Sequence, residues 1–347
     1  MAAFKGPLRW GFFGAGKITM DFANVLGTLP KSQHIPLGIA SRDSQRAKSF
    51  AEECGIQKSF ESYRQLAEDP EIDIVYIGTV NSEHYSQAKL AMEHSKHVLI
   101  EKAICVTHWQ CKDLIDTARK KGVFLMEGFW TNAFPATRKL LSEIRNGSVG
   151  DIIALTLEVG QDFGHLDRFR KKELGGGILL NHGVYGIMLS YILLGYPDVI
   201  TATGHLSAEA GVDETVTLTL SYKDKACMSN VIMSSRALLA AEFRVHGTKG
   251  IAKLPFPFWA PQKCVMPQKT FTYEHPECGT LDSDRFNYKH AQGFIYEIEE
   301  VYRCISEGHQ QSPFMPWDAS LAVMQIADEA RRQLGVTLPQ DENGENN

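Results

Sequence analysis

The chain has 347 residues, of which 44% are hydrophobic and 22% charged, and its formal net charge is −5 at pH 7. This length is enough for two domains with separate cores, and this composition excludes a disordered or fibrous protein. The densest basic stretch, residues 168–172, is interrupted by Phe169 and followed by Glu173. We therefore expect a globular protein that does not bind nucleic acid.

Seven cysteines are scattered along the chain without a C-x-x-C pair, and none is spaced with histidine as in zinc sites. We therefore predict free thiols and no metal site. The N-terminus has no apolar signal segment, and we find no apolar run of the about 18 residues that a membrane helix needs. These observations favour a cytosolic protein without a membrane partner.

The stretch from Leu8 to Asp43 predicts a strand, a glycine turn, a helix and a second strand. An apolar run at 8–13 leads into Gly14-Ala-Gly-Lys-Ile18, and another at 35–40 ends in Ser41-Arg42-Asp43. In such a unit the helix N-terminus presents free backbone N–H groups to a pyrophosphate. The order of these elements therefore predicts a dinucleotide site.

The glycines of this turn form an incomplete fingerprint. Gly14 allows the tight turn and Gly16 lets phosphates approach, but Thr19 stands where G-x-G-x-x-G has its third glycine. A G-x-G pair alone is weak, and an ordinary strand–helix turn is the alternative.

The end of the second strand indicates which nicotinamide cofactor binds. NAD-binding units usually place Asp or Glu there, which takes both ribose hydroxyls. Ser41 and Arg42 stand there instead, and an arginine can bind a 2′-phosphate through two parallel hydrogen bonds. We predict NADP rather than NAD; a solvated loop arginine next to Asp43 is the alternative.

Strands and helices continue to alternate as far as residue 126. The predicted helices cover 44–54, 63–68, 82–95 and 107–121, and the predicted strands cover 73–79, 97–100 and 123–126. This alternation predicts a parallel doubly wound sheet. We expect residues 1–128 to form a dinucleotide-binding Rossmann domain.

The pattern changes in the second half of the chain. The predicted strands cover 151–159, 199–206, 215–222, 226–233 and 241–246, and one long helix covers 178–194. Residues 215–220 alternate with a period of two, as half-exposed antiparallel strands do. We predict that residues 129–347 form an α/β domain with an open, largely antiparallel sheet, used for substrate binding and for homodimer contact through its uncovered face.

Ligands of open α/β sheets bind outside the carboxyl ends of the strands. The residues expected there, and therefore predicted to bind the cofactor, are Gly14, Gly16, Lys17, Ile18, Ser41, Arg42, Thr79, Asn81, His84, Glu101 and Trp130. Lys102 directly follows an apolar strand, which places a lysine at the strand tip; a surface lysine is the alternative.

A second group of polar residues enters the predicted helix at 178–194. Gly175-Gly-Gly177 allows a close backbone approach, and Asn181, His182 and Tyr185 stand within an otherwise apolar stretch. Asn181 and Tyr185 are four residues apart and share one helical face. The alternative for Tyr185 is a core residue whose hydroxyl is satisfied.

Taken in order, these motifs resemble the glucose–fructose oxidoreductase / inositol dehydrogenase / MocA-type family, over residues 8–339. Within it, they look most like the dimeric dihydrodiol dehydrogenases that also act as NADP-linked D-xylose dehydrogenases. The motifs that carry the resemblance are Gly14-Ala-Gly-Lys-Ile18, Ala40-Ser-Arg-Asp43, Thr79-Val-Asn-Ser-Glu-His84, Lys96-His-Val-Leu-Ile-Glu-Lys102, Phe129-Trp-Thr131, Leu174-Gly-Gly-Gly177 and Gly183-Val-Tyr185.

The resemblance implies roles for particular residues. In that family the lysine of a Glu-Lys-Pro motif lies beside the nicotinamide and the substrate hydroxyl, which is Lys102 here. The family's acid/base residue falls on Tyr185. The resemblance also implies that the second domain contacts the substrate; the residues so implied are Gln161, Asp162, His165, Arg168 and Asn181.

The chain departs from the family pattern at three positions. Ala103 replaces the proline of Glu-Lys-Pro, which often follows a cis peptide bond, so the backbone either shifts there or keeps the cis bond without proline. Asn181 replaces an aspartate and removes a negative charge, although it can still orient substrate hydroxyls. His182 replaces an apolar residue, and nothing in the sequence explains it.

The sequence thus predicts an NADP-dependent dehydrogenase of a vicinal diol or cyclic sugar, in which Tyr185 takes the hydroxyl proton. A phenol has a pKa near 10, and Lys102 within about 4–6 Å would lower it. One alternative is a reductase of a dicarbonyl or sugar ketone that uses the same residues. Another is an inactive NADP-binding regulatory protein, suggested by Ala103 and Asn181 but opposed by the retention of Lys102 and Tyr185.

Overall fold

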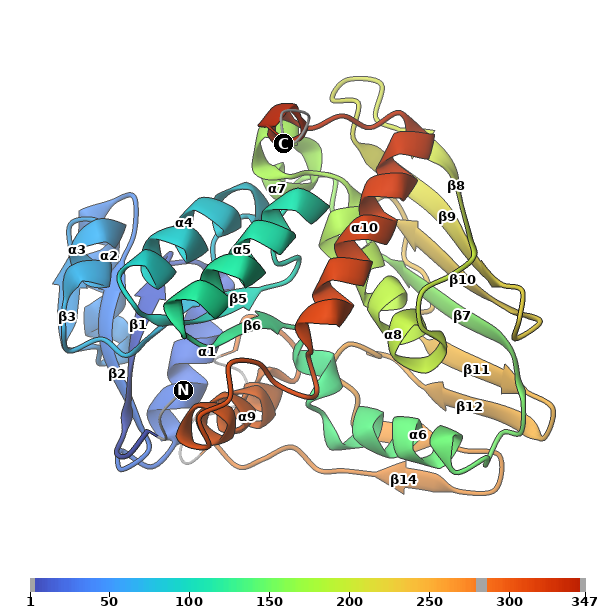
Figure 1. Ribbon diagram of the computed structural model, residues 1–347, viewed down its shortest axis with the longest axis horizontal. Helices are drawn as coiled ribbons and strands as arrows, with labels where there is room; N and C mark the ends of the chain where they lie inside the picture. The colour runs from blue at the N-terminus through green and yellow to red at the C-terminus, as the bar shows by residue number, and fades with distance from the viewer. Residues whose placement is uncertain (1–3, 279–285, 344–347) are drawn as a thin grey trace. The chain divides into compact units, whose positions relative to one another are not determined.

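The computed structural model describes residues 4–278 and 286–343, shown as a ribbon in Figure 1. The chain divides into two compact units. The first comprises the described residues up to Ile104, residues 112–130 and the described part of 275–317; the second comprises residues 105–111, 131–274 and 318 onward. The boundary expected after residue 128 stays a prediction.

The first unit is built on a six-stranded parallel sheet with the order β3-β2-β1-β4-β5-β6. Its strands are β1 (Leu8–Phe13), β2 (His34–Ala40), β3 (Lys58–Phe60), β4 (Ile74–Ile77), β5 (His97–Glu101) and β6 (Leu125–Gly128). The central strands are almost wholly buried because helices cover both faces of such a sheet. The strand order reverses between β1 and β4, which confirms the predicted doubly wound Rossmann domain.

Helices connect these strands as the alternating pattern predicted. They are α1 (Lys17–Thr28), α2 (Ser44–Cys54), α3 (Tyr63–Glu68), α4 (Asn81–Glu93), α5 (His108–Lys121), which runs from the second unit into the first, and α9 (Phe294–Ser306), with short 3₁₀ turns η1 (Trp130–Asn132) and η5 (Ala291–Gly293). Asp43 caps α2 by accepting the N–H groups of Gln45 and Arg46, and Gly55 ends it at φ +65°.

An aromatic core joins α1 and α9 to the sheet. Phe22 of α1 stacks on Tyr76 of β4 with ring centroids 4.0 Å apart, and it meets Phe294 of α9 at 5.3 Å. Phe294 in turn stacks on Trp130 at 4.6 Å. Each fully buried aromatic ring contributes about 1.5–3 kcal/mol by leaving water, so these contacts hold α9 on the Rossmann unit although it lies far along the chain.

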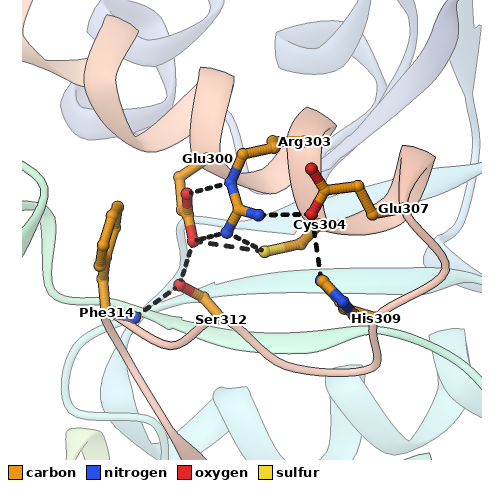
Figure 2. Close-up of polar contacts among 7 residues, drawn as sticks. All are labelled: Glu300, Arg303, Cys304, Glu307, His309, Ser312 and Phe314. Atoms are coloured by element: carbon orange, nitrogen blue, oxygen red, sulfur yellow. Dashed lines mark hydrogen bonds and ion pairs between the residues drawn. The ribbon is translucent and has the colours of Figure 1, made fainter.

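A polar cluster fixes the far end of α9 to the segment that follows it, as Figure 2 shows. The buried Glu300 carboxylate accepts two hydrogen bonds from the Arg303 guanidinium, at 3.0 and 2.9 Å, and another from the Ser312 hydroxyl. The same hydroxyl accepts the backbone N–H of Phe314 at 3.0 Å. Because the buried carboxylate is fully engaged, we read this cluster as structural.

The second unit contains an eight-stranded sheet with the order β14-β13-β12-β11-β7-β10-β9-β8. Its strands are β7 (Ile152–Gly160), β8 (Val199–Leu206), β9 (Asp213–Tyr222), β10 (Cys227–Ser234), β11 (Phe243–Gly247), β12 (Gly250–Leu254), β13 (Lys263–Val265) and β14 (Thr270–Thr272). β7 and β10 pair in parallel and the other neighbours pair antiparallel. This confirms the predicted open, largely antiparallel sheet.

Helices cover one face of this sheet, as Figure 1 shows for α6, α8 and α10. The helical segments are α6 (Pro135–Arg145), α7 (Asp167–Arg170), η2 (Lys172–Leu174), η3 (Leu179–Gly183), α8 (Val184–Leu194), α10 (Trp317–Leu334), which begins in the first unit, and η6 (Pro339–Asn343). The predicted helix at 178–194 is therefore not uniform, because η3 is a π-helical turn.

Glycines seat this helix directly on β10. A Cβ at Gly183 would lie 2.5 Å from Met233 Sδ, and one at Gly186 would lie 2.6 Å from two Val231 methyl groups. The helical segment 172–194 is long and apolar enough to cross a membrane. This finding corrects the expectation that the chain contains no such stretch. The segment is mostly buried within the second unit, as the core helices of soluble proteins are, so the run alone is weak evidence for a membrane span.

The other face of the sheet exposes apolar side chains. On β10, Met228 and Ile232 are exposed and alternate with the buried residues Val231 and Met233. Val199 of β8 and Ile251 of β12 are exposed on this face as well. The period of two thus leaves one face of the sheet uncovered by helices, and several apolar side chains are exposed on it among polar ones.

Candidate functional site

The predicted pyrophosphate loop lies at the carboxyl end of β1. Gly14 has φ +95°, and a Cβ there would lie 2.7 Å from Thr79 Cγ2, so a side chain is excluded by both conformation and space. Gly16 precedes the first residue of α1, and among the described residues no side chain caps that helix. The N–H groups at the start of α1 are therefore oriented as a pyrophosphate site requires, and the loop fits a dinucleotide.

The missing third glycine of the fingerprint has a structural explanation. Thr19 is fully buried, and its hydroxyl lies 3.5 Å from the carbonyl oxygen of Gly78 at the end of β4. A Cβ on Gly78 would lie 2.4 Å from that hydroxyl oxygen. The close helix–strand packing that the third glycine usually provides is thus achieved here by a glycine on the neighbouring strand.

Two arginines, rather than the one predicted, follow the end of β2: Arg42 directly and Arg46 in the first turn of α2. Arg42 is exposed, and the Ser41 hydroxyl donates to the carbonyl of Asp43. Arg46, in the first turn of α2, donates from Nε to the carbonyl of Ala15 at 2.9 Å. The sequence reasoning missed Arg46; its place three residues after the N-cap Asp43, opposite the glycine turn, was the signal that could have found it.

The end of β4 leads into α4, where three predicted site residues lie. Thr79 donates its hydroxyl to Gln87 at 2.8 Å, and Asn81 begins the helix. His84 is fully buried, and burial lowers its pKa to about 4, so the ring is neutral at pH 7.

The backbone around Lys102 is held from both sides. The Lys102–Ala103 peptide bond is cis although alanine follows, so the cis bond is retained without proline. His84 Nδ1 lies 2.7 Å from the Ala103 carbonyl oxygen, and the Ile104 N–H donates to Glu127 Oε1 at 2.9 Å. Two side chains from α4 and β6 thus fix the turn that presents Lys102, which is itself half-buried.

A buried carboxyl group, that of Glu297, neighbours the carboxyl group of Glu101, the residue before Lys102. Glu101 Oε1 accepts the hydroxyl of Tyr76 at 2.8 Å. Glu297 of α9 is fully buried, and neither of its carboxyl oxygens has a hydrogen-bond partner among the residues that the structure describes. Burial, and to a lesser extent the neighbouring Glu101, raise the pKa of Glu297 well above its usual range.

In the second unit, Tyr185 lies at the start of α8 and is 6% exposed. Its ring meets Phe258 edge-on at 5.8 Å. His182 stacks on Phe163 at 4.8 Å and on Phe169 at 5.5 Å, which gives the unexplained histidine a place in an aromatic cluster.

The remaining substrate candidates lie around this cluster. The Arg168 guanidinium lies over the Phe169 ring, 5.2 Å from its centroid, and His165 is exposed. The side-chain nitrogen of Asn181 lies within hydrogen-bond distance of the carbonyl oxygens of Gly177 and Arg168. Their roles in substrate binding stay predictions.

The structure thus gathers the predicted residues into two sets, each within one unit. The cofactor candidates and Lys102 belong to the first unit, at the carboxyl ends of its strands; Tyr185, Asn181, Arg168 and His165 belong to the second. Within 4–278 and 286–343, no group of three or more His, Cys, Asp or Glu side chains is arranged to hold a metal ion.

Comparisons with known sequences agree with this arrangement. Residues 8–129 match an oxidoreductase family with an NAD-binding Rossmann fold, and residues 137–253 match the GFO/IDH/MocA C-terminal domain. The chain is 36% identical over 335 residues to trans-1,2-dihydrobenzene-1,2-diol dehydrogenase of Xenopus tropicalis, which covers 95% of this chain and 99% of the relative. It is 35% identical over 341 residues to the Homo sapiens protein of that name, covering 96% and 99%.

Solved structures share the fold at lower identity. KijD10, a 3-ketoreductase from Actinomadura kijaniata in complex with NADP, matches with a TM-score of 0.79 at 22% identity, covering 94% of this chain and 98% of that one. Levoglucosan dehydrogenase in complex with NADH and levoglucosan matches with a TM-score of 0.82 at 20% identity, covering 96% and 100%. From its sequence and its fold, the chain belongs to the GFO/IDH/MocA family of NAD(P)-dependent oxidoreductases.

Proposed function

We propose that this protein is an NADP-dependent dehydrogenase that oxidises a vicinal diol or a cyclic sugar, of the trans-dihydrodiol or D-xylose type. The observation that carries this proposal is that the chain keeps a lysine and a tyrosine at the two positions that the family resemblance assigns to proton transfer. Lys102 is presented by a turn that His84 and Glu127 hold, and Tyr185 lies in the first turn of α8. The similarity to dihydrodiol dehydrogenases over nearly the whole chain supports the substrate class.

The proposal of NADP rather than NAD rests on the end of β2. Arg42 is exposed there, and Arg46 is held against the glycine loop through Ala15. Asp43 is the carboxylate next to them, but its Oδ1 is engaged by the N–H groups of α2. Two guanidinium groups suit a 2′-phosphate better than a ribose diol.

NADP, when bound, supplies the nicotinamide carbon that accepts a hydride. The chain's own residues would hold it and manage the substrate proton. The α1 N-terminus would take the pyrophosphate, and Tyr185 would remove the hydroxyl proton of the substrate as a general base. As the family resemblance implies, Lys102 would lie beside the nicotinamide and the substrate hydroxyl.

The direct test is to mix the purified protein with NADP and either D-xylose or a trans-dihydrodiol and to follow the absorbance of reduced nicotinamide. We expect cofactor reduction with at least one of these substrates, and NADPH to bind more tightly than NADH. If neither diols nor sugars are oxidised, and a dicarbonyl or sugar ketone is reduced instead, the substrate class proposed here is wrong.

We also propose a homodimer formed through the outer face of the eight-stranded sheet. The exposed apolar side chains there, Val199, Met228 and Ile232 among them, would be covered by the same face of a second copy. The Ile232→Lys and Met228→Lys double variant should sediment as a monomer. A wild-type protein that is monomeric at micromolar concentration would contradict this proposal.

A further inference from the structure

A buried carboxyl group faces the start of the helical segment that carries Tyr185. Asp213, the first residue of β9, is 2% exposed. Its Oδ2 accepts the backbone N–H of Leu179 at 2.7 Å, and the carboxyl is also hydrogen-bonded to the backbone N–H of Ile178. Both donors lie where the chain enters the π-helical turn η3, so Asp213 caps this turn from a distant strand.

The glycine turn before η3 makes room for this carboxyl group. Gly177 has φ +104°, and a Cβ there would lie 2.0 Å from Asp213 Oδ1. Any side chain at position 177 would therefore displace the carboxyl group as well as strain the backbone. At Gly177 the predicted close backbone approach is thus an approach to Asp213, whereas at Gly176 it is an approach to the backbone of Lys171 and Phe169.

Asn181 holds the same turn from its other side. Its side-chain nitrogen donates to the Gly177 carbonyl at 2.8 Å. An ionised aspartate at this position could only accept hydrogen bonds, so it could not make this contact. The departure from the family pattern at position 181 thus has a local reason. Asp213 accepts hydrogen bonds from N–H groups of the turn, and the Asn181 amide donates to a carbonyl of the turn, that of Gly177.

The direction of Tyr185 depends on this turn. A π turn contains more residues than an α turn, and each residue rotates a helix by about 100°. If η3 relaxed to an α turn, the residues after it would point in another direction. Gly183 packs against Met233 and Gly186 packs against Val231 in the present conformation, so a change in the turn would shift these contacts together with Tyr185.

We propose that Asp213 is a positioning residue of the active site, whose carboxylate fixes the start of η3 and thereby aims the hydroxyl of Tyr185. The inference rests on the proposed function, because it takes Tyr185 as the acid/base residue. Asp213 itself is assigned no contact with substrate or cofactor.

The charges around Asp213 give this role a pH dependence. Burial raises the pKa of Asp213 to about 7, against the opposing effect of the N–H groups of Leu179, Ile178 and Asp213 itself and of the Arg331 charge. The Arg331 guanidinium is itself paired with Asp328 and Asp341. Because the pKa is higher in the folded than in the unfolded state, ionisation of Asp213 destabilises the fold as the pH rises to about 7. If Asp213 served only to stabilise the fold, a neutral amide at this position would give a larger free energy of unfolding.

This difference leads to a test with the Asp213→Asn variant. The amide oxygen can still accept from Leu179, but the charge is lost. We expect turnover with NADP and substrate to fall about 10-fold to 100-fold, while the NADPH dissociation constant stays unchanged. The denaturation midpoint should be higher than that of the wild type at about pH 8 and equal to it at about pH 4. Asp198→Asn, an exposed aspartate of the same unit that accepts one backbone N–H, is the matched control and should leave turnover unchanged.

A double-variant comparison separates this inference from the proposed function. If Asp213 acts through Tyr185, the variant that combines Asp213→Asn with Tyr185→Phe should be no slower than Tyr185→Phe alone. Normal turnover of Tyr185→Phe would overturn the proposed function. If Tyr185→Phe has low turnover but Asp213→Asn has normal turnover, only the positioning role of Asp213 is overturned. The same holds if the double variant turns over more slowly than Tyr185→Phe.

The wild-type protein provides a second measurement that needs no variant. Because the pKa of Asp213 is raised in the folded state, an opening of the turn that exposes its carboxyl group is less favourable at lower pH. Hydrogen exchange of the N–H groups of Ile178 and Leu179, corrected for intrinsic rates, should therefore be slower at about pH 6 than at about pH 8. Equal protection at both pH values would contradict the inference, even if the Asp213→Asn variant fails to fold.

Discussion

His84 Nδ1 lies 2.7 Å from the carbonyl oxygen of Ala103, and this contact fixes the residue that follows Lys102. The second ring nitrogen lies 3.3 Å from the carbonyl oxygen of Thr79. Both partners are acceptors, and a neutral imidazole carries one N–H, which we assign to the shorter contact. His84 thus works as a neutral donor to the Lys102 turn rather than as a proton-transfer group.

Replacing His84 should therefore impair the Lys102 turn without removing a charge at neutral pH. In His84→Leu the Ala103 carbonyl loses its donor, which costs about 1–3 kcal/mol, and displacement of Lys102 should lower kcat/KM about tenfold or more. Steady-state kinetics and thermal unfolding measure the two effects. The control is His94→Leu at the end of the same helix, where the side chain is half-exposed. Equal effects at both positions would show that His84 does not position Lys102.

The two arginines at the end of β2 should act on NADP selectively. Arg42→Ala and Arg46→Ala should each weaken NADP binding, because each removes a charge-assisted contact worth about 1.5–3 kcal/mol of binding free energy. The dissociation constant of NAD should change far less. Fluorescence titration with the reduced forms of both cofactors measures this difference. Arg46→Ala should also affect NAD slightly, because Arg46 holds Ala15. If both cofactors weaken equally, the arginines are structural and the NADP proposal is wrong.

The exchange of roles between Thr19 and Gly78 can be tested by compensation. Gly78→Ala should destabilise the protein by about 1–3 kcal/mol, because its Cβ would lie 2.4 Å from the Thr19 hydroxyl and 2.9 Å from the Tyr76 ring. Adding Thr19→Gly should recover part of this loss, less about 1 kcal/mol for a glycine within α1. Denaturant unfolding of the single and double variants measures the recovery. Simple addition of the two losses would mean that Thr19 and Gly78 do not compete for the same space.

Buried neutral histidine should make the protein less stable in acid. His34 is 1% exposed, accepts the Trp10 indole N–H at Nδ1, and has a pKa lowered to about 4 by burial. Its folded pKa lies below the unfolded value of about 6.5, so the unfolded state binds the proton first. The stabilising contribution of the neutral ring is complete above pH 6.5 and falls by roughly 3 kcal/mol as the pH drops to about 4.

The variant His34→Gln measures this contribution. Its free energy of unfolding should depend less on pH between about 6.5 and 4 than that of the wild type. His205→Gln changes an exposed histidine and is the control. The comparison must be made between these two variants, because protonation of Asp213 stabilises the fold as the pH falls below about 7. The same acid dependence in both variants would show that His34 is not buried as a neutral group.

Much of the fold follows from local patterns. Strands and helices alternate up to residue 128, and the Thr215–Leu220 stretch has the period-two pattern of β9, so both sheets could be predicted. β13 and β14 could not, because three residues are too few to show a period. The π-helical turn η3 also escaped prediction, since its apolar residues look like those of an α-helix.

The site was predictable where its residues follow strand ends or match motifs. Lys102, Ser41 and Gly14 were predicted in this way, and each directly follows a strand of the parallel sheet. Asp213 was not, because it acts on a turn more than thirty residues earlier in the chain and its own neighbours form an ordinary strand. The three glycines at 175–177 predicted a close approach of another part of the chain, but the sequence does not indicate which part. The structure shows that Gly177 lies against Asp213.

The central claim is that Tyr185 is the acid/base residue of an NADP-dependent dehydrogenase. Its most direct test is the turnover of Tyr185→Phe, measured with NADP and the best substrate, alongside its NADPH affinity. We predict that turnover falls at least about a hundredfold while NADPH binds as tightly as before, because general acid–base catalysis of this kind is worth about 10²–10⁴ in rate. Unchanged turnover would remove Tyr185 from the mechanism and contradict the account.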